Sequence, residues 1–131
     1  NYNELDNLNP INNYAWSKLG GEASVILYKN SLILRLAMTE FPFLHKKAFI
    51  DAKNNFIYSY KVARFLPLLL NEKGIINIGS SKTESIYAFA KRVNPKVKKI
   101  SYKKIKNFPK NSSINITKLK KVLKGKYKLK W

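Results

Sequence analysis

The stretch NNYAWSKLGGEASVILYKNSLILRLAM, residues 12–38, places a helical pattern directly before a short apolar segment. From about residue 13 to residue 29, apolar residues recur three and four positions apart, as on one face of a helix. Gly20 and Gly21 interrupt this helix and each costs roughly 1 kcal/mol relative to alanine, so we expect a neighbour packed closely against that face. Residues 31–38 are apolar and bounded by polar residues, which predicts a buried strand.

The alternation of helix and strand continues along the chain. Segment 39–55 is ambiguous and favours a loop at 41–43 with a short helix at 45–55. Capping residues, proline and glycine bound three further expected helices: 60–74 with a kink at Pro67 and a stop at Gly74, 82–93 capped by Ser80 or Ser81, and 115–123 capped by Asn115. Extended segments are expected at 55–59, 75–79 and 97–102. This order predicts an α/β protein with a mostly parallel sheet, built as a single unit over residues 1–131.

The composition excludes several classes of protein. With 131 residues, 45% of them hydrophobic, the chain has enough apolar side chains for the core of one domain. It has no cysteine and one histidine, His45, so we expect neither a disulfide framework nor a metal centre. No segment approaches the roughly 20 apolar residues of a membrane span and no signal peptide opens the sequence, so we expect a cytoplasmic protein. The asparagine at position 1 suggests a fragment or a processed form.

The charge is strongly positive, with a net value of +19. Between residues 95 and 131 there are 14 lysines and no acidic residue, a composition that phosphate backbones attract. However, lysine is abundant along the whole chain, and arginine contributes only three of the 26 basic residues, whereas nucleic-acid surfaces favour its forked guanidinium. We interpret the lysines as solvated faces and do not expect nucleic acid as a partner.

Tyr14 and Lys18 lie four residues apart in the first expected helix and therefore on one of its faces. A neighbouring ammonium stabilises a phenolate, which lets a tyrosine transfer protons near neutral pH. Such a tyrosine can protonate a carbonyl oxygen while a reduced nicotinamide gives hydride to the carbon. The spacing alone is a weak signal, because it occurs three times: Tyr14/Lys18, Tyr87/Lys91 and Tyr102/Lys106.

The surroundings of the first pair distinguish it from the other two. In YNELDNLNPINNYAWSKLGGE, residues 2–22, an acidic stretch and a proline lead into Tyr-x-x-Ser-Lys, followed by Leu, Gly and Glu. This segment resembles the active-site segment of the extended short-chain dehydrogenase/reductase family, and more closely its sugar-nucleotide reductase branch, the dTDP-4-dehydrorhamnose reductase type. The resemblance continues in order through residues 31–40, 74–93 and 111–123, and so covers most of the chain.

The resemblance implies the C-terminal part of a Rossmann-like doubly wound parallel sheet together with the substrate-binding portion. A catalytic helix would span about 12–29 and a substrate-side α/β region about 30–131. Tyr14 would be the catalytic acid/base, Lys18 would activate it and contact the nicotinamide ribose, and both would therefore bind NAD(P)H. The implied activity is reduction of a 4-keto-deoxysugar nucleotide; an epimerase or dehydratase of the family, which uses the same pair, is the nearest alternative.

Other residues near these segments have roles that the sequence leaves open. Thr39 and Glu40 follow the expected strand, where α/β folds carry their ligand loops, so we expect them to bind substrate. Ser17 is expected to serve as helix scaffolding. Glu22 either pairs with the lysine one turn before it or makes a surface ion pair. Arg35 is either a buried charge near the substrate or a strand-end residue that reaches solvent.

The chain departs from the family in what it lacks. The family binds NAD(P) through a Gly-x-x-Gly-x-x-Gly turn, with the pyrophosphate at a helix N-terminus. The five glycines, at 20, 21, 74, 79 and 125, do not form this pattern, and Phe108–Pro109 stands where the branch often has Arg-Pro. The family's catalytic Ser/Thr would lie upstream of residue 1. We therefore expect the N-terminal nucleotide-binding half to come from the same or a separate chain, and this chain alone to be inactive.

Two interpretations from other classes of protein remain. A non-catalytic partner module would bind a separate chain through its sheet edge and apolar surface. A basic nucleic-acid-binding domain would use the lysines of residues 95–131. A second copy of the chain is a further candidate partner, in a homodimer.

Overall fold

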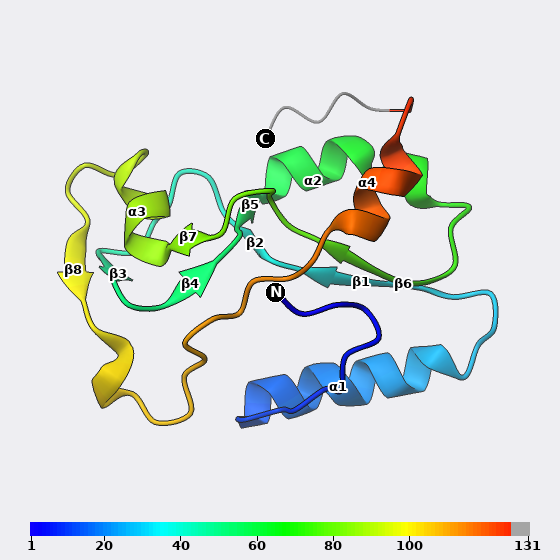
Figure 1. Cartoon of the computed structure of the whole chain (residues 1–131), viewed down its shortest axis with the longest axis horizontal. Coiled ribbons are helices and arrows are strands. Elements are labelled where there is room, and N and C mark those ends of the chain that lie inside the picture. The colour runs from blue at the N-terminus through cyan, green and yellow to red at the C-terminus, as the bar shows by residue number, and fades with distance from the viewer. Residues whose placement is uncertain (127–131) are drawn as a thin grey trace.

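The computed structural model describes residues 1–126, so the last five residues of the basic segment lie outside the described part. At its centre β1 (Leu32–Leu36) pairs in parallel with β6 (Gly74–Ile78), in a register that joins Leu32 to Gly74 and Leu36 to Ile78. The helix α1 (Asn13–Ile26) lies on one side of this ladder, and α2 (Ser59–Phe65) and α4 (Thr117–Leu123) lie on the other (Figure 1).

Three shorter ladders extend the molecule beyond β1 and β6. In parallel pairs, β2 (Met38–Thr39) joins β5 (Ile57–Tyr58), and β3 (Lys47–Phe49) joins β8 (Lys98–Ile100). The fourth pair, β4 (Lys53–Asn54) with β7 (Glu84–Ser85), is antiparallel. The prediction of an α/β protein with mostly parallel strands is therefore confirmed.

The main core fills the space between the β1–β6 ladder and the helices α2 and α4. Leu119 and Leu123 from α4 meet Ile76 and Ile78 from β6, and all four side chains are almost completely buried. Each buried side chain of this size stabilises the fold by roughly 1.5–3 kcal/mol relative to an exposed one. A smaller cluster packs under α3 (Ile86–Lys91) and consists of four buried residues: Phe43, Ala48, Ala90 and Val97.

The prediction of a short helix at 45–55 is wrong. The segment forms β3 and β4 instead, because Ala48 enters the small cluster beside Ala90 while the backbone of 47–49 pairs with β8. Long-range pairing and burial override the weak local helical preference of such a short segment.

The helix expected at 60–74 is shorter than predicted and does not simply kink. It ends at Phe65, and a 3₁₀ turn, η1 (Leu66–Leu69), follows with Pro67 in its first turn. Proline lacks a backbone N–H, and its ring clashes with the preceding turn of an α-helix. Gly74, whose φ is +80°, begins β6 rather than ending a helix.

Two helix caps in the structure also differ from the predicted ones. The Ser85 hydroxyl caps α3 by accepting a hydrogen bond from Ala88 N at 3.1 Å, so neither Ser80 nor Ser81 is the cap. Asn115 does accept a hydrogen bond, from Thr117 N at 2.8 Å, but it lies one residue before the N-cap of α4. A second short 3₁₀ turn, η2 (Tyr102–Lys104), follows β8.

Candidate active site

Helix α1 begins at a well-formed cap and runs antiparallel to β1. The Asn12 side chain accepts a hydrogen bond from Ala15 N at 2.9 Å and donates one to the carbonyl of Asn107 at 3.5 Å. The N-terminal turns of α1 therefore lie near the carboxyl end of β1 (Figure 1). In α/β folds this is the end of the strands at which ligands bind.

Tyr14 and Lys18 come together on one face of α1. The Lys18 ammonium lies over the Tyr14 ring, 5.2 Å from the ring centroid, which is within the range of a cation–π contact. Tyr14 is 72% exposed, so its hydroxyl is open to an incoming ligand. The Ser17 hydroxyl donates to the Tyr14 carbonyl at 2.8 Å, a contact of the kind expected for helix scaffolding.

A groove of about 820 Å³ separates α1 from β1. Tyr14, Lys18 and Glu22 enter it from successive turns of the helix. Apolar side chains form most of its remaining wall, and they come from the N-terminal segment, α1, β1 and the start of β2: Leu8, Pro10, Leu19, Val25, Leu32, Ile33, Leu34, Leu36 and Met38. The groove therefore combines a hydrophobic wall with a few polar groups, as ligand and partner sites do.

Gly20 and Gly21 do not contact a close neighbour, so that prediction is wrong for the described part of the chain. A Cβ atom placed on either glycine would meet nothing within 4 Å. Within residues 1–126, no residue of α1 is buried. The helix also ends at Ile26, three residues before the predicted end.

Glu22 pairs with Arg35 rather than with Lys18. Arg35 on β1 donates through Nε to Glu22 Oε2 at 3.1 Å and through a terminal nitrogen to Glu22 Oε1. Its other terminal nitrogen donates to the carbonyl of Glu4 at 3.0 Å. Arg35 is thus a paired, largely buried charge that links α1, β1 and the N-terminal segment.

Thr39 and Glu40 lie beyond the groove. Thr39 ends β2 and stands opposite Tyr58 in the β2–β5 pair, and Glu40 follows it as an exposed residue. The groove wall reaches Met38 and, among the described residues, includes neither Thr39 nor Glu40. Their role in substrate binding stays a prediction.

An aromatic cluster follows Glu40, and the sequence reasoning missed it. Phe41 meets the rings of Tyr58 and Tyr60 edge-on at 5.1 and 5.7 Å, and the two tyrosines stack at 5.9 Å. Tyr58 also contacts Phe89 of α3, and burial raises the pKa of Tyr58. Six aromatic residues within 41–60 were the available signal, but their spacing along the chain does not reveal which of them share a cluster.

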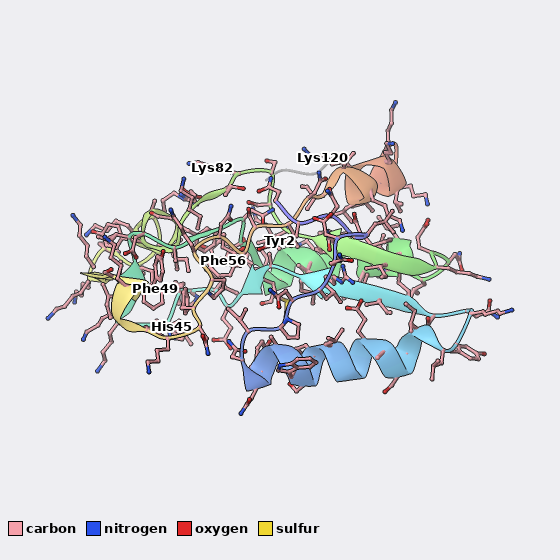
Figure 2. All side chains as sticks on the ribbon, turned by 60° about the horizontal axis from the view of Figure 1, so that its bottom comes forward. Tyr2, His45, Phe49, Phe56, Lys82 and Lys120 are labelled. Carbon is pink, nitrogen blue, oxygen red and sulfur yellow. The ribbon has the colours of Figure 1, made fainter. Side chains whose placement is uncertain are left out.

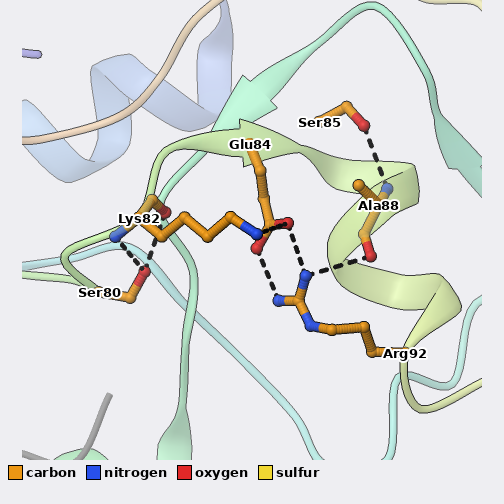
Figure 3. Close-up of polar contacts among 6 residues, drawn as sticks. All are labelled: Ser80, Lys82, Glu84, Ser85, Ala88 and Arg92. Atoms are coloured by element: carbon orange, nitrogen blue, oxygen red, sulfur yellow. Dashed lines mark hydrogen bonds and ion pairs between the residues drawn. The ribbon is translucent and has the colours of Figure 1, made fainter.

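A second polar cluster lies around Glu84, on the opposite side of the molecule from α1. Arg92 donates to both Glu84 carboxylate oxygens at 2.6 Å, and Lys82 lies 3.2 Å from one of them (Figure 3). These hydrogen bonds from Arg92 are the main reason why the pKa of Glu84 is below its usual value. Figure 2 shows Lys82 on the side of the molecule away from α1, and none of Lys82, Glu84 and Arg92 lines the groove, so this cluster is separate from it.

The remaining candidates from the sequence lie elsewhere. Tyr87 lies under the ammonium of Lys99 and Tyr102 stacks on Phe108, so neither of the other Tyr-x-x-x-Lys pairs reaches the groove. His45 is exposed beside the Phe43 ring. The part of the chain that the structure describes holds no cluster of His, Cys, Asp or Glu that could bind a metal. It also holds no helix long and apolar enough to cross a membrane.

Comparison with known proteins identifies the fold. No protein-family model and no curated protein matches the chain. The solved structures of similar fold include the following three. A hypothetical dTDP-4-dehydrorhamnose reductase from Sulfolobus tokodaii has a TM-score of 0.77 and 29% identity, over 94% of this chain and 52% of that chain.

The other two are dTDP-4-dehydrorhamnose reductases from bacteria. The enzyme from Bacillus anthracis, in complex with NADP, has a TM-score of 0.75 and 21% identity over 91% of this chain and 51% of that chain. The enzyme from Yersinia enterocolitica has a TM-score of 0.71 and 24% identity over 88% and 52%. The chain therefore spans about half the length of the reductases it matches.

Proposed function

We propose that this chain, which has the fold of dTDP-4-dehydrorhamnose reductases over about half of their length, is the C-terminal, substrate-side portion of an NAD(P)H-dependent sugar-nucleotide reductase. The observation that carries the proposal is the contact between Lys18 and the exposed Tyr14, both of which line the groove. The substrate class is a nucleotide sugar with a keto group at carbon 4. An epimerase or dehydratase is not favoured, because the matched enzymes are reductases.

The chemistry assigned to the pair is proton delivery. The Tyr14 hydroxyl donates its proton to the keto oxygen as that oxygen gains negative charge. The Lys18 ammonium, next to the ring, stabilises the phenolate that remains. When bound, NAD(P)H supplies the hydride that the keto carbon accepts.

The residues of this chain fit only one end of the cofactor. Tyr14 and Lys18 are accessible to a nicotinamide ribose, whereas Gly20 and Gly21 lie inside α1 and the other glycines, 74, 79 and 125, are scattered over separate elements. None of them forms the turn that would receive a pyrophosphate. The proposal therefore requires a nucleotide-binding half, in the same polypeptide or in a separate one.

The surface around α1 supports that requirement. Within residues 1–126, the β1–β6 ladder has only two strands, so the outer edge of β1 is unpaired. Leu36 and Met38 at the end of this edge are more than 40% exposed, and Trp16 on α1 and Leu27 at its C-terminal end are 60% and 84% exposed. An unpaired edge beside an apolar groove suits another polypeptide that adds a strand and a hydrophobic face.

The test is an assay of the chain together with its nucleotide-binding half. We expect stoichiometric oxidation of NAD(P)H when a nucleotide-linked 4-keto-6-deoxysugar is added, and no oxidation with this chain alone. Conversion of the sugar without net oxidation of NAD(P)H would indicate an epimerase or dehydratase instead. A preparation that binds the half but converts no sugar would favour the non-catalytic partner module, and native mass analysis of the same sample would reveal a homodimer.

A further inference from the structure

Helix α1 is held to the rest of the molecule by few contacts. No residue of α1 is buried within the described part of the chain, and the groove lies between the helix and β1. At its first turn the helix is linked to the loop at Asn107 through the cap residue Asn12. Hydrophobic packing therefore does little to fix how the helix is rotated and placed above the strand.

The pair of Glu22 and Arg35 supplies a directional contact between the two elements. The guanidinium binds both carboxylate oxygens, and the two side chains are only 15% and 18% exposed. A guanidinium that donates two parallel hydrogen bonds fixes the angle as well as the distance between its partners. Because both side chains are mostly buried, dissolved ions weaken the attraction between them less than they would weaken that of an exposed pair.

Arg35 is itself anchored on its other side. It donates to the Glu4 carbonyl at 3.0 Å, and the Glu4 carboxylate accepts a hydrogen bond from Asn77 N of β6 at 3.0 Å. Asn77 stands opposite Arg35 in the β1–β6 register. A continuous chain of polar contacts thus runs from both central strands, through the N-terminal segment, to Glu22 on α1.

We propose that Arg35 and Glu22 are positioning residues that set α1 on the sheet and thereby hold Tyr14 and Lys18 in place. Glu22 follows Lys18 by four residues and Tyr14 by eight, so all three lie on the same helix face and enter the same groove. A rotation of α1 about its axis would move the tyrosine hydroxyl away from its substrate. The proposal rests on the function proposed for Tyr14 and Lys18.

The first test measures the placement of α1 without any catalysis. Hydrogen exchange is followed in the 131-residue chain and in its Glu22→Gln and Arg35→Gln variants. We expect exchange of the α1 amides to rise about tenfold in each variant, because removing one partner leaves the other charge unpaired. Exchange in α4 should change less than about twofold, which would show that the core remains folded. A Glu72→Gln variant, which removes an ion pair with Lys126, is the matched control.

A double variant tests whether the two residues act through one contact. In Glu22→Gln with Arg35→Gln, we expect exchange of the α1 amides to lie within about threefold of that in either single variant, because both changes remove the same contact. Unchanged exchange of α1 in the single variants, or a further rise of about tenfold in the double variant, would overturn the proposal.

The second test uses the chain assembled with its nucleotide-binding half. Per folded enzyme, Glu22→Gln should lower kcat about tenfold and change the KM for the sugar nucleotide less than about twofold, because proton delivery depends on alignment. Faster exchange in α1 with an unchanged kcat would contradict the positioning role. If the unsubstituted assembly reduces no sugar nucleotide, the proposed function fails, while the exchange measurements still decide whether this pair places Tyr14 and Lys18.

Discussion

Lys18 places its ammonium over the ring of Tyr14, 5.2 Å from the ring centroid, while the ring itself remains mostly exposed. The contact shows that the four-residue spacing in the sequence becomes a true side-chain pair in the folded chain. Because the pair faces a groove rather than bulk solvent alone, a bound ligand would desolvate it further and strengthen the electrostatic coupling between the two groups.

Replacing Tyr14 by phenylalanine should remove the proton donor and leave the ring contact with Lys18. In the assembled reductase we expect kcat to fall about 10²- to 10⁴-fold, the usual contribution of general acid catalysis, with little change in folding. Steady-state kinetics with a 4-keto sugar nucleotide would measure the loss. Tyr28→Phe is the matched control, since Tyr28 is also exposed but lies after α1 and outside the groove. Equal activity of the two variants would remove Tyr14 from the mechanism.

Truncating Leu119 should weaken the main core. The side chain is fully buried between α4 and β6, so Leu119→Ala removes apolar contacts and leaves a cavity. We expect the free energy of unfolding to fall by about 2–5 kcal/mol. Urea denaturation followed by circular dichroism would measure it, with Leu70→Ala as a control because Leu70 is 78% exposed. A similar small loss in both variants would contradict the core described for α4.

Two glycines should respond in opposite ways to alanine. A Cβ at Gly79 would lie 2.9 Å from both the side-chain nitrogen and the carbonyl oxygen of Asn55, so Gly79→Ala should destabilise the chain by about 1–3 kcal/mol. Gly20→Ala meets open space inside a helix and should stabilise it by about 0.5–1 kcal/mol. Thermal unfolding of the two variants measures the difference, and a loss of stability at Gly20 would show that the face is occupied in the isolated chain.

Stability should depend on pH through Glu84. Because Arg92 lowers the pKa of this carboxyl in the folded state, the charged form is favoured by folding. Its contribution is present above the ordinary pKa of an unfolded glutamate and is lost as the pH falls through the lower, folded value. We expect Glu84→Gln to cost about 1 kcal/mol or less at pH 7, allowing for solvent screening, and to cost less than that below pH 4. Denaturation midpoints at the two pH values test this; an equal cost at both would contradict it.

The elements that could be predicted from the sequence are those with long periodic or uninterrupted apolar patterns. The helix at Tyr14, the strands 32–36 and 74–78 and the final helix at Leu119 all appear in the structure. The segment around Ala48 could not be predicted, because its strand exists through pairing with residues about fifty positions away. Short segments carry too little local preference to reveal such partners.

The candidate site also contains one contact that could be predicted from the sequence and one that could not. The pairing of Tyr14 with Lys18 follows from helical geometry and was predictable. The partner of Glu22 was not, since Arg35 lies on another element and Lys18 was an equally good candidate by spacing. An arginine in an apolar strand, in a chain where only three of the 26 basic residues are arginine, was the one available signal.

The β3–β8 pair sets Lys47 directly opposite Lys98 in register, and both side chains are exposed. Like charges that face each other across a ladder repel, and the net charge of +19 adds to that repulsion over the whole molecule. Dissolved anions reduce such repulsion within a Debye length of about 8–10 Å at moderate ionic strength. Added salt should therefore raise the free energy of unfolding of this chain. Its stability then depends on the ionic strength of the buffer.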